Sequence, residues 1–142
     1  MKPGRETAVE KFEKKGYNCC QAVVCTYSDR FGISEEKVFR LTEGFGLGMG
    51  GLMDTCGAVT GMFLTLSLAN SAGDMENPLA TKMDTYGKIR EAAAEFKERK
   101  GSASVYCRDL KTENGKQPLP CCTSCVETAA AIMDEMLAKM QG

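Results

Sequence analysis

Cysteine is the residue type in this chain that is best suited to chemistry. The sequence contains eight cysteines and no histidine. Without histidine, the chain cannot build Ser-His or Cys-His catalytic pairs, His-ligated zinc sites or His-ligated haem. Any reaction must therefore use sulfur, carboxylate, amine or backbone groups. The cysteines fall into four regions of the chain: Cys19, Cys20 and Cys25; Cys56; Cys107; and Cys121, Cys122 and Cys125.

Several of these cysteines lie where helices are predicted to begin. Cys19, Cys56 and Cys122 each fall within the first turn of a predicted helix, as does Cys20. The unpaired N–H groups and the positive end of the helix dipole stabilise a thiolate there, and they can lower a cysteine pKa from ~8.5 to ~3.5–7.5. Thiolate is the form that binds metals and attacks disulfides. Cys25 instead fits simple burial as a small hydrophobic residue.

The segment Cys122-Thr-Ser-Cys125 is a C-x-x-C motif at a predicted helix start. Its spacing suits either a dithiol/disulfide couple or two ligands of one metal ion. The chain lacks the βαβ pattern of a thioredoxin-like domain, and Val126 follows the motif, so it is not a C-x-x-C-H haem attachment site. A zinc ribbon would need a second C-x-x-C. The motif alone therefore leaves redox and metal-binding uses open.

Glycines form a second feature. Five of the eight residues in 44–51 are glycine, in a pattern that matches neither a P-loop nor G-x-G-x-x-G. We expect either a close backbone approach, with N–H groups arranged as an anion-binding nest, or a flexible loop. A G-x-x-x-G pair follows Cys56, where small residues permit close packing or leave room for a cofactor beside the sulfur. The candidate cofactor-binding positions are Gly50, Gly51, Gly57 and Gly61.

Hydrophobic periodicity and capping residues predict helices throughout and no strand of useful length. The predicted fold is all-α, a single domain of about five to six helices around a central apolar helix at about 55–72. A long helix is expected to begin at Asn77-Pro78 and to end at Gly101. Its expected apolar stripe consists of Leu79, Met83, Tyr86, Ile89, Ala93 and Phe96. The other expected helices cover 5–15, 19–31, 34–43, a short stretch from Ser104, and 122–140.

Composition excludes several classes of protein. The 142 residues, 43% hydrophobic and 26% charged, suit one globular domain, and a net charge of −1 gives no basic surface for nucleic acid or anionic lipid. Residues 55–73 carry no charge, but their six Thr, Ser and Asn residues favour a buried core helix over a membrane span. The charged segment 1–15 resembles no signal peptide, so we expect a cytoplasmic protein. In that reducing compartment, eight thiols indicate metal binding or redox chemistry rather than structural disulfides.

A combination of motifs connects the chain to a known family. The segment CGAVTG at 56–61 follows GYNC at 16–19, and it precedes CRDL at 107–110 and the C-x-x-x-V pattern at 122–126. With these motifs, the chain resembles the C_GCAxxG_C_C family of redox-active proteins over about residues 12–137. The resemblance implies a redox role and places the family's four cysteines at Cys19, Cys56, Cys107 and Cys122. Because Cys20 and Cys121 are adjacent to two of these, the assignment is uncertain by one place in each pair.

Two redox hypotheses follow. In the first, the thiolates of Cys19, Cys56, Cys107 and Cys122 hold an iron–sulfur cluster for electron transfer, with Cys20, Cys121 and Cys125 as secondary ligand candidates. In the second, no metal is bound and the same four cysteines are redox-active thiols. The candidate disulfide couples are then Cys122 with Cys125, and Cys19 or Cys20 with Cys56.

Two further hypotheses make the protein non-enzymatic. One is a structural zinc site on four cysteines, and the other is a helical interaction module with inert thiols. For the redox hypotheses, the expected partner is an electron donor or acceptor protein. A homodimer is compatible with a redox protein of this size, whereas neither nucleic acid nor a membrane is expected as a partner.

Overall fold

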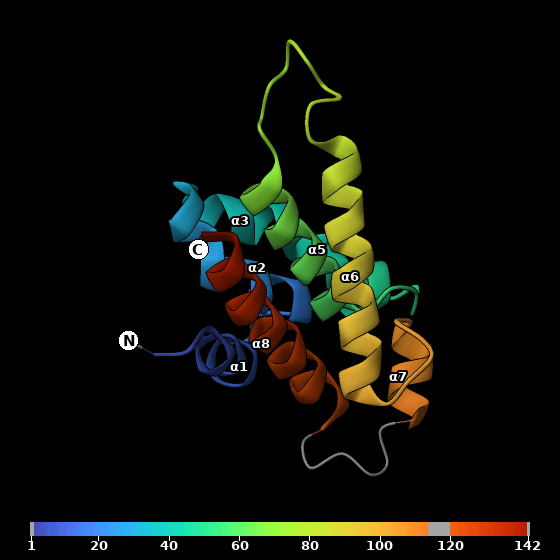
Figure 1. The fold of residues 1–142 in the computed structure, drawn as a ribbon. Helices are drawn as coiled ribbons and strands as arrows, with labels where there is room; N and C mark the ends of the chain where they lie inside the picture. The colour runs from blue at the N-terminus through green and yellow to red at the C-terminus, as the bar shows by residue number, and fades with distance from the viewer. Residues whose placement is uncertain (1, 114–119, 142) are drawn as a thin grey trace.

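A computed structural model describes residues 2–113 and 120–141 of the chain. Within these ranges the structure is all-α, as predicted, and forms one domain without a β-strand (Figure 1). Its helical segments are α1 (Gly4–Lys14), α2 (Cys19–Tyr27), η1 (Ser28–Phe31), α3 (Glu35–Thr42), η2 (Glu43–Phe45), α4 (Gly46–Gly50), α5 (Gly57–Asn70), α6 (Lys82–Lys100), α7 (Cys107–Glu113) and α8 (Cys121–Gln141).

Capping residues set several helix ends as the sequence predicts. The Asn18 side chain accepts a hydrogen bond from Gln21 N–H at 2.9 Å, and the Gln21 side chain accepts one from Asn18 N–H at 2.9 Å, which completes a capping box. Ser34 caps α3 in the same position. Gly32 ends η1 with φ 71° and Gly101 ends α6 with φ 64°, both in the left-handed region that glycine adopts without steric cost.

The apolar helix α5 lies at the centre of the domain, packed against α2, α6 and α8 (Figure 1). Val59, Met62 and Leu66 of α5 are fully buried, together with Val23 of α2 and Val126 of α8. The prediction that this uncharged segment is a core helix is therefore confirmed. In the described part of the chain, no helix combines the length and the apolar character that crossing a membrane requires.

The start of α6 differs from the prediction. The helix begins at Lys82, four residues after Pro78, because Asn77 takes part in a turn and does not cap a helix. The carboxylate of Asp74 accepts hydrogen bonds from Glu76 N–H at 3.0 Å and Asn77 N–H at 3.2 Å. These bonds hold the chain in the turn conformation that aspartate favours.

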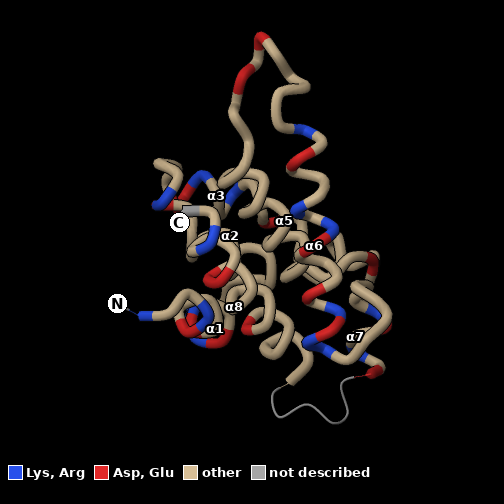
Figure 2. The backbone as a smooth tube through the Cα atoms, viewed as in Figure 1, with Lys and Arg blue, Asp and Glu red and all other residues tan. Residues whose placement is uncertain are grey.

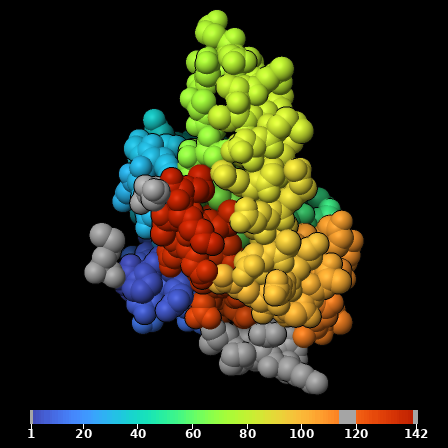
Figure 3. All heavy atoms as spheres, viewed as in Figure 1, coloured from blue at the N-terminus to red at the C-terminus, as the bar shows by residue number. Residues whose placement is uncertain are grey.

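As a result, residues 71–86 project from the body of the molecule, and we refer to this segment as the finger (Figures 1 and 3). The apolar stripe predicted for α6 is buried at Phe96 but exposed at Leu79, Met83 and Tyr86. The first half of the predicted stripe therefore packs against no core within the part of the chain that the structure describes, and Leu79 precedes the helix.

Candidate functional site

Six of the eight cysteines line one small cavity where four segments of the chain meet. The cavity measures about 10 Å³, roughly the room that one water molecule requires. The four cysteines assigned by family resemblance therefore lie together, although they are far apart in the sequence. The complete lining is Cys19, Leu47, Gly48, Cys56, Gly57, Cys107, Leu110, Lys111, Cys121, Cys122 and Cys125.

Each of the four segments contributes its sulfur at a helix start. Cys19 is the first residue of α2, Cys107 of α7 and Cys121 of α8, and Cys56 is the N-cap of α5. The positive ends of several helix dipoles therefore point toward the sulfur atoms. The sequence predicts this placement in three regions, and the structure adds the fourth at Cys107.

Backbone hydrogen bonds hold Cys56 beside Cys107. Thr55 and Tyr106 form an isolated antiparallel bridge, Cys56 N–H donates to Val105 C=O at 2.8 Å, and Cys107 N–H donates to Asp54 C=O at 2.6 Å. The N-cap of α5 is Cys56 and not the preceding acidic residue, Asp54. Its backbone is committed to Cys107, so the chain turns into α5 two residues later.

The glycine segment forms a left-handed turn against this pair. Leu47, Gly48 and Met49 have φ of 51°, 63° and 74°, with ψ between 43° and 58°, so α4 is left-handed at its centre. A Cβ atom on Gly48 would lie 2.7 Å from the backbone nitrogen of Asp54 and 2.8 Å from the Cβ of Cys107. The close backbone approach that the sequence suggests is therefore present, and it forms one wall of the cavity.

Cys122 has the environment of a reactive thiolate. Hydrogen bonding from the Cys19 thiol, together with the nearby Lys111 ammonium, lowers the pKa of Cys122 to about 5 against the opposing effect of burial. The Lys111 Nζ donates to the Cys122 Sγ at 3.4 Å. The same interaction raises the pKa of Cys19, and burial raises it further. At neutral pH the pair is thus a half-buried thiolate and a buried thiol.

Cys56 and Cys125 form a second pair deeper in the protein. Hydrogen bonding from the Cys125 thiol lowers the pKa of Cys56, and the backbone N–H groups of Val59 and Ala58 at the start of α5 lower it further against desolvation. The pKa of Cys125 is raised, first by this interaction and then by burial. These pairings differ from the predicted couples because Cys122 and Cys125 face different segments from the first turn of α8.

Cys20 and Cys25 lie outside the cavity. Both are buried in a separate apolar cluster with Val24 and Val38. Burial raises the pKa of Cys20 to about 12 and that of Cys25 to about 11, so both are neutral thiols at physiological pH. The interpretation of Cys25 as a small hydrophobic residue is confirmed. Of the adjacent cysteines, Cys19 rather than Cys20 borders the cavity, whereas Cys121 and Cys122 both border it.

The four candidate glycines have different positions. Gly57 borders the cavity, and a Cβ there would lie 2.7 Å from the Phe45 carbonyl oxygen and 3.1 Å from the Cβ of Cys19. Gly61 lets α5 approach α2, since a Cβ would lie 3.0 Å from the Cβ of Val23. Gly50 and Gly51 follow the left-handed turn and are not part of the cavity lining.

Lys111 is a site residue that the sequence analysis did not identify. It lies four residues after Cys107, which places the two side chains on the same face of a helix. That spacing is the signal from which it could have been found.

Lys111 provides a direct test of the electrostatics. We expect Lys111→Gln to raise the pKa of Cys122 by about one unit, because the variant removes a cation from a partly solvated thiolate. The pH dependence of Cys122 alkylation by iodoacetamide, followed by mass spectrometry, measures this shift. Lys139→Gln, on an exposed lysine far along α8, serves as the control. An unchanged midpoint in Lys111→Gln would show that the cation does not act on this sulfur.

The cysteines are free thiols, and no disulfide is present among them. Within residues 2–113 and 120–141, no group of three or more Cys, Asp or Glu side chains is arranged to hold a metal ion.

The fold and the site together define an all-α, cysteine-rich protein whose thiols are equipped for redox chemistry. The chain belongs to the family described as "Putative redox-active protein (C_GCAxxG_C_C)", whose model matches residues 17–136. No curated protein and no solved structure matches the chain.

Proposed function

We propose that this protein is a thiol–disulfide redox protein in which Cys122 is the nucleophile and Cys19 the resolving thiol. The observation that carries the proposal is the half-buried Cys122 thiolate, whose pKa of about 5 depends on the adjacent Cys19 thiol and on Lys111. A thiolate is the attacking species in disulfide exchange, and a second thiol within reach completes the reaction. The partner is a cytoplasmic protein that carries a disulfide or a dithiol.

The reaction balances in two steps. The Cys122 thiolate attacks one sulfur of the partner's disulfide; a mixed disulfide forms and the partner's other sulfur leaves as a thiolate. Cys19 gives its proton to that thiolate and attacks the Cys122 Sγ, which releases the partner's first sulfur as a second thiolate. The protein then holds a Cys19–Cys122 disulfide and the partner has gained two electrons. A dithiol reductant restores the starting state.

The raised pKa of Cys19 explains why the two reaction steps occur in this order, with attack by Cys122 first. Its largest cause is the interaction with the Cys122 thiolate. Once Cys122 is bonded to the partner, that negative charge is gone and Cys19 loses its proton more easily. The resolving thiol therefore becomes a nucleophile only after the mixed disulfide has formed.

Titration with glutathione redox buffers tests the proposal. We expect two thiols to oxidise reversibly, and peptide mass spectrometry to find the peptide of Cys19 linked to that of Cys122. Cys19→Ser should instead trap Cys122 as a mixed disulfide with glutathione, because no second thiol resolves it. Cys20→Ser and Cys121→Ser are the matched controls and should keep the link. The proposal fails if no pair oxidises reversibly.

An iron–sulfur cluster is the second candidate, favoured by the six cysteines around one cavity. Cys19, Cys56, Cys107 and Cys122 would supply the four thiolates, and the cluster would supply one-electron transfer. The donor chemistry fits, but a cavity of about 10 Å³ requires the side chains to move apart first. Iron and sulfide content after oxygen-free purification decides between the candidates, and one zinc per chain would indicate a structural zinc site instead.

A further inference from the structure

The finger exposes more apolar surface than a projecting element of a monomer needs. The exposed fractions of Met75, Leu79, Met83 and Tyr86 are 90%, 71%, 69% and 48%. Single exposed apolar residues are ordinary, but four on one projection form a patch of the kind that marks an interaction site. Three of them belong to the apolar stripe predicted from the sequence: Met83 and Tyr86 lie on α6, and Leu79 lies in the turn before it.

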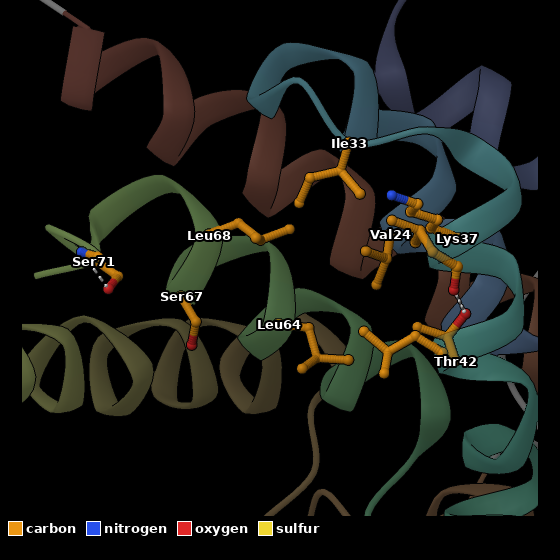
Figure 4. A pocket seen from close by; sticks show the side chains of 11 residues that line it. Val24, Ile33, Lys37, Thr42, Leu64, Ser67, Leu68 and Ser71 are labelled. Atoms are coloured by element: carbon orange, nitrogen blue, oxygen red, sulfur yellow. Dashed lines mark hydrogen bonds between the residues drawn. The ribbon is translucent and has the colours of Figure 1, made fainter. Parts of the chain in front are cut away.

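An apolar groove of about 460 Å³ lies between α3 and α5, next to the base of the finger. Figure 4 shows Val24, Ile33, Leu64 and Leu68 pointing into it from three sides. Lys37 is the charged residue of its lining, and among the described residues it forms no ion pair. The groove therefore combines apolar walls with one unpaired cation.

We propose that this groove receives the finger of a second copy of the chain in a two-fold symmetric dimer. The groove wall ends at Ser71 and Gly73, the first residues of the same finger. A two-fold axis beside that point runs the two fingers antiparallel, so that the tip of each finger reaches the groove of the other copy. Every contact is then made twice.

The charges of the two surfaces are complementary. Met75 lies between Asp74 and Glu76, and Figure 2 shows acidic residues at and close to the tip of the finger. Insertion of Met75 between the apolar walls brings Glu76 toward the unpaired Lys37. The apolar side chains supply the burial and the charges select the orientation.

Hydrogen bonds within the finger order it at its base and in its turn. The Asp74 carboxylate fixes the turn at its tip, and Ala72 N–H donates to the Thr81 Oγ1 at 3.1 Å across its base. A segment that is already ordered loses less conformational entropy on association.

Sedimentation velocity of the full chain, with reductant present to exclude intermolecular disulfides, tests the dimer. We expect a concentration-dependent dimer whose dissociation constant rises about 100-fold or more in Met75→Asp, because each dimer loses two buried methionines. Met75 is solvated in the monomer, so the substitution leaves folding intact. Leu52→Asp is the control, at a residue that is 70% exposed but belongs to neither surface.

Charge reversal tests the orientation. Lys37→Glu and Glu76→Lys should each weaken the dimer by about tenfold, and their combination should restore it. The proposal is overturned if the wild-type protein stays monomeric to about 1 mM or if Met75→Asp dimerises as tightly as wild type. Binding of a long-chain carboxylate to a monomer would likewise overturn it, since the groove would then belong to a small ligand.

Discussion

Replacing Cys122 with Ser should abolish the fast reaction of the folded protein with thiol reagents at pH 6. With a pKa of about 5, the Cys122 sulfur is mostly thiolate at that pH, whereas an ordinary cysteine with a pKa of ~8.5 is only about 0.3% thiolate. Low-pKa thiolates are weaker nucleophiles, with a Brønsted slope of ~0.4–0.5, so the net advantage is about tenfold. That advantage should disappear in Cys122→Ser.

Stopped-flow reaction with a chromogenic disulfide measures this rate across pH. In the wild-type protein the rate should fall by half near pH 5, because protonation removes the Cys122 thiolate below its pKa. Cys25→Ser is the matched control, at a buried thiol outside the cavity, and should keep the fast phase. Cys56 is only 5% exposed as a residue, so its thiol should not contribute to the fast phase. A fast phase that survives in Cys122→Ser would assign the reactive thiolate to another cysteine.

Gly48→Ala should cost about 2–5 kcal/mol of the free energy of unfolding. The residue has φ 63°, where an L-residue with a side chain pays roughly 1–2 kcal/mol, and the added methyl group would clash with the Asp54 backbone and the Cys107 side chain. Backbone atoms cannot yield as a flexible side chain does. Because native proteins have ~5–15 kcal/mol of stability, this single methyl group could unfold a large part of the population.

Alanine substitutions at two neighbouring glycines distinguish the cost of a positive φ from the cost of the steric clash at Gly48. Gly51→Ala should lower the free energy of unfolding only through backbone strain, because φ is 96° and no atom lies within 4 Å of a Cβ at this position. Gly44→Ala has open space as well and lacks a positive φ, so it should be close to neutral. Urea denaturation of the three variants should therefore rank Gly48 well above Gly51, and Gly51 above Gly44. Equal losses at all three positions would contradict the close approach at Gly48.

The helix ends that the sequence predicts correctly depend on residues close in the chain. Asn18 and Gln21 are three positions apart, and Gly101 directly follows the helix that it ends, so local chemistry decides the outcome. Asn77 shows the limit of this reasoning. Its Asn-Pro signal favours a helix start, but the Asp74 carboxylate accepts hydrogen bonds from the backbone N–H groups of Glu76 and Asn77 and holds this part of the chain in a turn.

The site, like the helix ends, was predictable only where it depends on residues close together in the chain. Cysteine types, their positions at helix starts and the family motif identify Cys19, Cys56, Cys107 and Cys122, but they do not determine which sulfur faces which. That depends on the packing of α8 against α2 and α5. The pairing of Cys122 with Cys19, and the role of Lys111, are consequences of this tertiary contact.

The convergence of four chain segments on one cavity makes the acidity of Cys122 a report on the integrity of the whole molecule. An unfolded chain scatters these sulfur atoms, and every cysteine then titrates like a thiol in a short peptide. Local opening that lifts the first turn of α8 would have the same effect without global denaturation. The native protein thus carries, in one side chain, an intrinsic probe of partial unfolding that needs no added label.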